Sequence, residues 1–326
     1  MAGEGVHRLV VVVVAVEGGV SEIVHGTRVP PHSRRCLLER RPQSRVGRAT
    51  VGPVPDTTET ETAILTDDRE RVRYITLNRP ERRNALTMAQ LGQFFDTLAD
   101  ADAAPDVGAI VVQGAGGAFC SGIDLDPDEI DLDYDSRSFE QELALVEPFR
   151  RFEEMWRLRT PVIASVQGYC LAVGTDIAFH ADMTVCSDDA QFGYPIVRSM
   201  ASPSTHMWTY LAGPQWAKRL LLTGDMIDGA TAARAGFVLE AVPADELAEH
   251  THALARRVAT VPGDISSANK AICNKVLDLM GYTLAQEMAR EHNVIAHQSP
   301  AAQEFGRIIR TEGFKAALAW QAEQFG

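Results

Sequence analysis

The sequence lacks any apolar run long enough to cross a membrane. Its longest such run, L-V-V-V-V-V-A-V at 9–16, has eight residues, whereas a membrane-spanning helix needs about 20. The preceding segment carries Glu4 and Arg8, and no small-residue cleavage site follows the run, so we do not expect a signal peptide. We therefore expect a cytoplasmic protein with no membrane partner.

Positive charge is scarce as well. The chain has 31 Lys and Arg against 44 Asp and Glu, which gives a net charge of −13. Such an acidic balance argues against nucleic acid as the main partner, because nucleic-acid binding depends on neutralising phosphates with Lys and Arg. Any anionic ligand must instead be held by a local cluster of positive charge.

Paired cysteines are also missing. The chain has five cysteines, an odd number, and no C-x-x-C spacing. We interpret them as reduced thiols, and we expect neither a disulfide framework nor a zinc site. A Rossmann fingerprint and a P-loop are absent too. The sequence therefore predicts no metal and no bound cofactor.

What is present divides the chain into regions. Residues 1–60 show no helical or strand period. They contain eight Arg and six acidic residues, so we predict a disordered N-terminal extension. A targeting or regulatory arm is the alternative interpretation. Strand and helix patterns alternate after about residue 61, and from about 244 to the end the pattern is helical. This order predicts an α/β fold.

Several elements can be placed from their patterns. T-A-I-L-T and V-R-Y-I-T-L-N flank D-D-R-E, which predicts a β-hairpin. Thr87 precedes an amphipathic run and is expected to cap a helix. One long helix is predicted over 139–158, after an acidic loop at 125–138. Further strands are predicted at 108–114, 162–166, 183–187 and 238–242.

Two turns could hold an anionic oxygen. The first, F-C-S-G-I-D-L (119–125), follows a buried strand, and the second, A-V-G-T-D (172–176), follows another strand and opens a helix. Free backbone amides in such turns favour negative charge. Val173 and Asp176 are three residues apart, so an amide and a carboxylate could face one pocket. Taken alone, the first turn is better explained as a tight strand-to-helix connection.

Together these segments resemble the crotonase superfamily, the enoyl-CoA hydratase/isomerase family. The matching stretches are I-T-L-N-R-P-E-R-R-N-A-L (75–86), G-A-F-C-S-G-I-D-L (117–125), P-V-I-A-S-V-Q-G-Y-C-L-A-V-G-T-D-I-A (161–178), A-Q-F-G-Y-P (190–195) and L-L-T-G-D-M-I-D-G-A-T-A-A-R-A-G-F-V (221–238). The resemblance implies a crotonase-like spiral of ββα units over 61–260. It also implies a C-terminal helical region for oligomerisation over 261–326, with assembly as a homotrimer or hexamer.

The resemblance also implies a function. Members of the family bind acyl-CoA thioesters, so coenzyme A would enter only as part of the substrate, and they stabilise an enolate with two backbone amides. By position these amides belong to Ser121 and Val173. The residues that would contact CoA or the acyl group are Arg82, Arg83, Ala85, Gly122, Ile123, Asp124, Tyr194 and Ile196.

The sequence departs from the family at the catalytic acids. Family hydratases use two glutamates; the first aligns with Asp176, but Ile196 stands at the second and cannot transfer a proton. One interpretation is an acyl-CoA enzyme with Asp176 as its only acid/base, acting in isomerisation, hydrolysis or decarboxylation. Another is a hydratase whose second proton comes from Tyr194, Ser202, Ser204 or His206.

Two further alternatives stay open. The protein could be a catalytically silent acyl-CoA-binding or assembly protein. Asp176 could also be purely structural, capping a neighbouring helix or pairing with Arg198. We favour an enzyme, because an acid in an apolar pocket is costly unless it is used.

Overall fold

The computed structural model describes residues 62–325. The extension predicted for 1–60 lies outside these residues, so that prediction stays untested. Within the described part of the chain, no helix is both long and apolar enough to cross a membrane.

A six-stranded sheet forms the centre of the described unit. The first two strands form an antiparallel hairpin, as the sequence predicted, and every later pairing in this sheet is parallel. The order across the sheet is β1 (Ile64–Arg69), β2 (Val72–Leu77), β3 (Ala109–Gly114), β4 (Val162–Val166), β6 (Met183–Ser187) and β9 (Glu240–Val242). The α/β prediction is confirmed.

A smaller sheet continues from the ends of these strands. It contains β5 (Tyr169–Leu171), β7 (Gln191–Gly193) and β8 (Met226–Asp228) in that order. β5 leaves the end of β4 after a turn at Gly168, so the chain crosses directly from the large sheet into the small one. This crossing places the second predicted turn beside the first.

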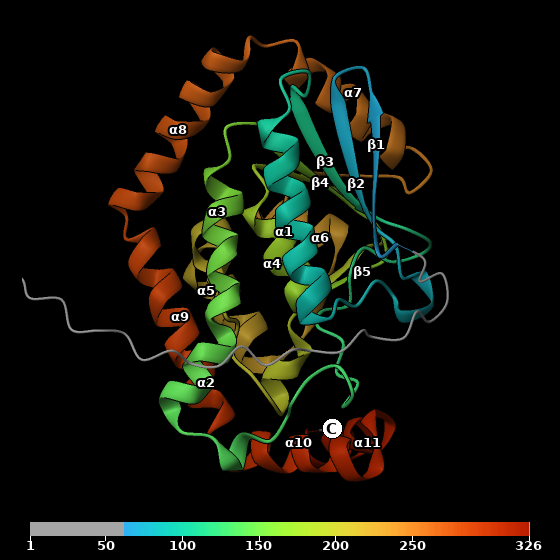
Figure 1. The fold of residues 1–326 in the computed structure, drawn as a ribbon. Helices are drawn as coiled ribbons and strands as arrows, with labels where there is room; N and C mark the ends of the chain where they lie inside the picture. The colour runs from blue at the N-terminus through green and yellow to red at the C-terminus, as the bar shows by residue number, and fades with distance from the viewer. Residues whose placement is uncertain (1–61, 326) are drawn as a thin grey trace, which may run out of the picture. The chain divides into compact units, whose positions relative to one another are not determined.

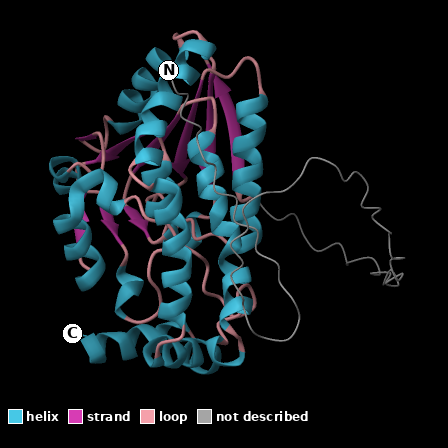
Figure 2. Ribbon diagram, turned by 90° about the vertical axis from the view of Figure 1, so that its left-hand side faces the viewer, coloured by secondary structure: helices cyan, strands magenta, loops and turns pink. Residues whose placement is uncertain are grey.

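Helices cover both faces of the large sheet (Figure 2). On one face α7 (Leu247–Ala259) packs against alternate strand residues such as Val111 and Ile163. On the other face lie α1 (Met88–Ala103), α3 (Arg151–Arg157) and α4 (Val173–His180). Thr87 caps α1 with a capping box, as predicted: its side chain accepts from the Gln90 N–H.

The prediction of a single helix over 139–158 is wrong. The chain instead forms α2 (Phe139–Val146), the 3-10 helix η3 (Glu147–Arg150) and then α3. Pro148 explains the break, since proline has no N–H to continue the α-helical pattern. The break turns α2 away from α3 and brings it against α9 (Tyr282–His297).

The C-terminal region is helical, as expected. α5 (Trp208–Thr223) and α6 (Gly229–Ala235) precede α7, and α8 (Gly263–Leu279) leads into α9. α10 (Pro300–Glu312) and α11 (Phe314–Phe325) pack against each other at the end of the unit opposite the β1–β2 turn (Figure 1). These last helices close one side of the cavity described next.

Candidate functional site

A cavity of about 1010 Å³ lies among the two predicted turns, α2, α9 and the last two helices. Nine of the eleven predicted site residues line it, while Gly122 and Asp176 do not. The nine are Arg82, Arg83, Ala85, Ser121, Ile123, Asp124, Val173, Tyr194 and Ile196. The structure therefore brings residues from four of the five matching stretches, and Ile196 just after the fourth, to one site.

The two turns approach closely because glycine stands at their contacts. A side-chain carbon on Gly174 would lie 2.3 Å from the Cys120 carbonyl oxygen, which is closer than such atoms come. Gly122 has a φ of +115°, and a side chain there would meet Ala172 at 3.0 Å. Only glycine fits such contacts at low cost. The N-terminus of α4 is thereby held against the turn that follows β3.

Some backbone amides of these turns already donate hydrogen bonds within the protein, and others do not. The Ser121 N–H donates to the Arg83 carbonyl at 3.0 Å. The Ser121 N–H, which the resemblance assigned to binding a thioester oxygen, is therefore already used within the protein. The N–H groups of Ile123 and Val173 donate to no acceptor among residues 62–325. Both residues line the cavity, so the structure offers two unpaired amides there.

Asp176 is buried beneath the cavity wall rather than part of it. Its Oδ1 accepts a hydrogen bond from Thr205 Oγ1 at 2.5 Å, and its Oδ2 is buried with no hydrogen-bond partner in the described chain. Burial raises the pKa of the Asp176 carboxyl to about 7, although the Thr205 bond opposes this. Asp176 does not pair with Arg198. The Arg198 guanidinium instead forms an ion pair with Asp225, with 3.4 Å between Nη2 and Oδ1.

Only two of the four residues considered as a source of the second proton line the cavity. Tyr194 and Ser204 line it, whereas Ser202 and His206 do not. The Tyr194 pKa is raised well above its usual value, first by burial and then by nearby Asp176, against a hydrogen bond from the Ser204 backbone. The phenol is therefore protonated at neutral pH. Ile196 lines the cavity, so an apolar side chain occupies the second glutamate's position.

The loop with the arginine cluster is pinned to the site. Asn84 is fully buried, and its Nδ2 donates to the carbonyls of Ala115 and Ala118. Arg79 is committed to Asp124, with 2.9 Å between Nη1 and Oδ2. Arg83 lies over the Tyr169 ring at 4.9 Å. Arg82 is half-exposed, and its ion pair with Asp126 is long, at 3.5 Å between Nη2 and Oδ2, so its guanidinium can turn toward a phosphate.

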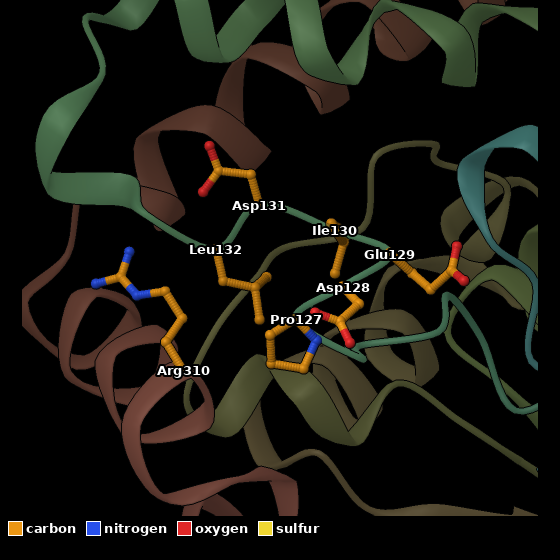
Figure 3. A pocket seen from close by; sticks show the side chains of 7 residues that line it. All are labelled: Pro127, Asp128, Glu129, Ile130, Asp131, Leu132 and Arg310. Carbon is orange, nitrogen blue, oxygen red and sulfur yellow. The ribbon is translucent and has the colours of Figure 1, made fainter. Parts of the chain in front are cut away.

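The acidic loop after the first turn forms a smaller hollow beside the cavity. The hollow measures about 350 Å³ and is lined by Arg310 and the loop residues 127–132. Figure 3 shows Arg310 reaching from α10 toward this loop, where its Nη1 lies 2.7 Å from Asp133 Oδ1. The loop is thereby attached to the C-terminal helices.

Sequence reasoning missed several polar residues of the cavity. Glu142 of α2 and His297 of α9 both line it, and the His297 Nδ1 lies 2.6 Å from Glu142 Oε1. Asn293 lines it one helical turn before His297. No motif marks these residues, which come from two helices far apart in the sequence.

The comparisons with known proteins agree with this architecture. The family model for enoyl-CoA hydratase/isomerase matches residues 67–310. The chain belongs to the enoyl-CoA hydratase/isomerase family. It is 29% identical to a probable enoyl-CoA hydratase, echA8, of Mycobacterium bovis over 265 residues, which cover 80% of this chain and 97% of that protein. It is 34% identical over 274 residues to a putative enoyl-CoA hydratase, EchA13, of Mycobacterium tuberculosis, covering 74% and 84% respectively.

Solved structures show the same fold. An enoyl-CoA hydratase/isomerase from Xanthobacter autotrophicus superposes with a TM-score of 0.76 at 32% identity, covering 82% of this chain and all (100%) of that one. An enoyl-CoA hydratase from Mycobacterium smegmatis gives a TM-score of 0.75 at 32% identity, with 81% and 95% coverage. The predicted crotonase fold with C-terminal helices is confirmed.

Proposed function

We propose that the protein is an acyl-CoA enzyme of the hydratase-like type that stabilises a thioester enolate with the backbone amides of Ile123 and Val173. The single observation that carries this proposal is the pair of unpaired N–H groups at the cavity wall. Two amides aimed at a developing oxyanion are the usual device for stabilising such an intermediate. Ile123 replaces Ser121 in this role, because the Ser121 amide already donates to Arg83.

In this proposal the substrate spans the site from the arginine loop to the C-terminal helices. The CoA phosphates lie near Arg82, since a guanidinium is suited to phosphate recognition. The acyl group enters the cavity, whose wall includes apolar side chains such as Phe149, Met200 and Leu318. Val173 adds bulk beside the thioester and so shapes the start of the acyl pocket.

Asp176 is the proposed acid/base. A carboxyl group with a pKa of about 7 exchanges protons readily near neutral pH, which is the property that a general acid/base requires. Its Oδ2 has no partner in the described chain and is free to take up a proton. The group must reach the substrate, so the Thr205 side chain has to yield when the acyl group binds.

One observation favours the silent acyl-CoA-binding alternative. The Asp176 carboxyl does not line the cavity, and Ile196 fills the position of the second acid. Turnover distinguishes the two: an enzyme converts a member of a panel of enoyl-CoA and 3-hydroxyacyl-CoA thioesters, while a silent protein binds them unchanged.

The test of the oxyanion assignment is Ile123→Pro, which removes the N–H. If the fold is kept, turnover should fall roughly 10²–10³-fold, the usual cost of one oxyanion-hole donor. Ile123→Val is the matched control, because it keeps the amide and most of the side chain. Equal turnover by the folded proline and valine variants would remove Ile123 from the oxyanion site.

A further inference from the structure

The acyl cavity contains a strip of polar side chains along one wall. Ser204, Asn293, His297 and Glu142 form this polar strip, and all four line the cavity. Asn293 Nδ2 donates to Ser204 Oγ at 3.0 Å, and His297 Nδ1 lies 2.6 Å from Glu142 Oε1. All four residues are buried. Polar groups so deep in an acyl pocket are costly unless a ligand or water uses them.

The contacts of Glu142 fix the tautomer of His297. Glu142 Oε2 also accepts from Arg137 Nε at 2.6 Å. Although burial opposes ionisation of Glu142, the hydrogen bonds from His297 and Arg137 outweigh it and lower the pKa of the carboxyl. An ionised carboxylate only accepts hydrogen bonds, so Nδ1 carries the imidazole proton. In the neutral ring Nε2 is then an acceptor.

This acceptor has no donor in the described part of the chain. His297 Nδ1 is the only atom of the ring with a hydrogen-bond partner among residues 62–325. The ring is held in place by stacking on Tyr134, with 4.5 Å between the ring centroids. The neighbouring Asn293 Oδ1 likewise has no partner in the described chain. The polar strip therefore holds two acceptors and lacks the donors that would satisfy them.

We propose that the protein selects acyl-CoA thioesters whose acyl group carries a hydroxyl in the middle or at the end of the chain, away from the thioester, and that this hydroxyl donates to His297 Nε2. The inference rests on the proposed function, because it takes the cavity as the acyl pocket. A hydroxyl supplies the missing donor without adding charge.

A carboxylate substituent does not fit the polar strip. It offers only acceptors, and it would lie near Glu142 and Asp131. Arg137, the cation that contacts both of those acids, is already committed to them at 2.6 Å. Tyr134, which stacks on His297, stays protonated because burial raises the pKa of its phenol. Glu142 and Tyr134, the groups in contact with His297, therefore leave Nε2 as an acceptor and supply no positive charge.

The test measures binding, so it does not depend on knowing the reaction. Saturated eight-carbon acyl-CoAs are compared by isothermal titration calorimetry: the plain chain, chains with a hydroxyl at the middle or the end, and a chain ending in a carboxylate. The better hydroxylated ligand should bind roughly 5- to 150-fold tighter than the plain one, the range expected for satisfying a buried acceptor. The carboxylate should bind no tighter than the plain chain.

His297→Leu should bring the affinity ratio of hydroxylated to plain ligand to about one. His297→Phe serves the same purpose if the leucine variant fails to fold, because its ring can still stack on Tyr134 but has no nitrogen to accept a hydrogen bond. His292→Leu, at an exposed position of the same helix, is the control and should keep the ratio.

The outcomes separate this inference from the function on which it rests. Plain acyl-CoA that binds as tightly as the hydroxylated forms would overturn the inference alone, and would mean that water satisfies His297. A preference that survives in the folded His297 variants would also overturn it. If no acyl-CoA binds, the proposed function fails and the inference with it.

Discussion

Asp176 places a carboxyl group in a buried position, where ionising it costs free energy. The side chain is 1% exposed, and Thr205 supplies its one hydrogen bond. A fully buried carboxylate with a single neutral donor is poorly compensated, so the protonated form is favoured. The raised pKa, about 7, expresses this cost. At the residue scale, the acid is thus a source of instability that selection for stability alone would replace.

This cost predicts how stability depends on pH. Between about pH 4, where an unfolded Asp loses its proton, and pH 7, the folded protein keeps a proton that the unfolded chain has lost. The free energy of unfolding of the wild type therefore falls as pH rises through this window, and the full cost is present at pH 8. Asp176→Asn removes the charge and should be more stable than wild type at pH 8, by up to roughly 4 kcal/mol.

Urea unfolding at pH 8 and pH 4 measures this difference. The difference should shrink to less than about 1 kcal/mol at pH 4, where the folded carboxyl is protonated and the unfolded one is about half protonated. In the same variant, turnover should be lost while acyl-CoA binding remains, because asparagine cannot accept a proton. A stability difference that does not change with pH, together with intact turnover, would make Asp176 a purely structural residue.

At the scale of elements, the sequence predicted the hairpin, the capped α1 and the buried strands, because each is specified by local patterns. The break between α2 and α3 was missed although Pro148 marks it. The choice between the amides of Ser121 and Ile123 could not be read locally. It depends on the Arg83 carbonyl, which a distant loop brings to Ser121.

The contact between α4 and the turn after β3 gives a test at this scale. Gly174→Ala would place a methyl group 2.3 Å from the Cys120 carbonyl oxygen, so α4 must move away from the turn. We expect a loss of about 1–3 kcal/mol in the free energy of unfolding, the usual cost of overpacking. Turnover should also fall, because the Ile123 and Val173 amides separate.

Gly117→Ala is the matched control for this substitution. A side-chain carbon there would meet nothing within 4 Å, and the residue does not need a positive φ. Its stability, measured by thermal unfolding, should stay close to that of wild type. Gly174→Ala with wild-type stability and turnover would show that the two elements are not held by this contact.

At the scale of the whole described unit, the site is assembled from segments that no local pattern connects. Glu142 and His297 are 155 residues apart and meet only because Pro148 turns α2 toward α9. The sequence could identify the family motifs on the thioester side of the cavity. It could not identify the opposite wall, where Glu142 and His297 come from helices that no motif marks.

The outer surface of α8 and α9 predicts self-association. Large apolar side chains are exposed along both helices, and a series of this kind on a single chain usually marks an interface. They are Ile265, Ile272, Val276, Leu279, Met280, Leu284, Met288 and Ile295. Together with the trimers or hexamers that the family resemblance implies, this surface leads us to expect a homo-oligomer built through α8 and α9.

Leu279→Glu tests the assignment of this surface. Leu279 is 80% exposed in the single chain, so the substitution should leave the fold of the subunit intact. In an oligomer it would bury an unpaired carboxylate, which costs roughly 3 kcal/mol or more and should raise the concentration for half-dissociation at least about 100-fold. Leu222→Glu is the control, because Leu222 is equally exposed at 80% but lies on α5. Analytical ultracentrifugation of the wild type at a monomer mass of 35.6 kDa at all concentrations would rule out the oligomer.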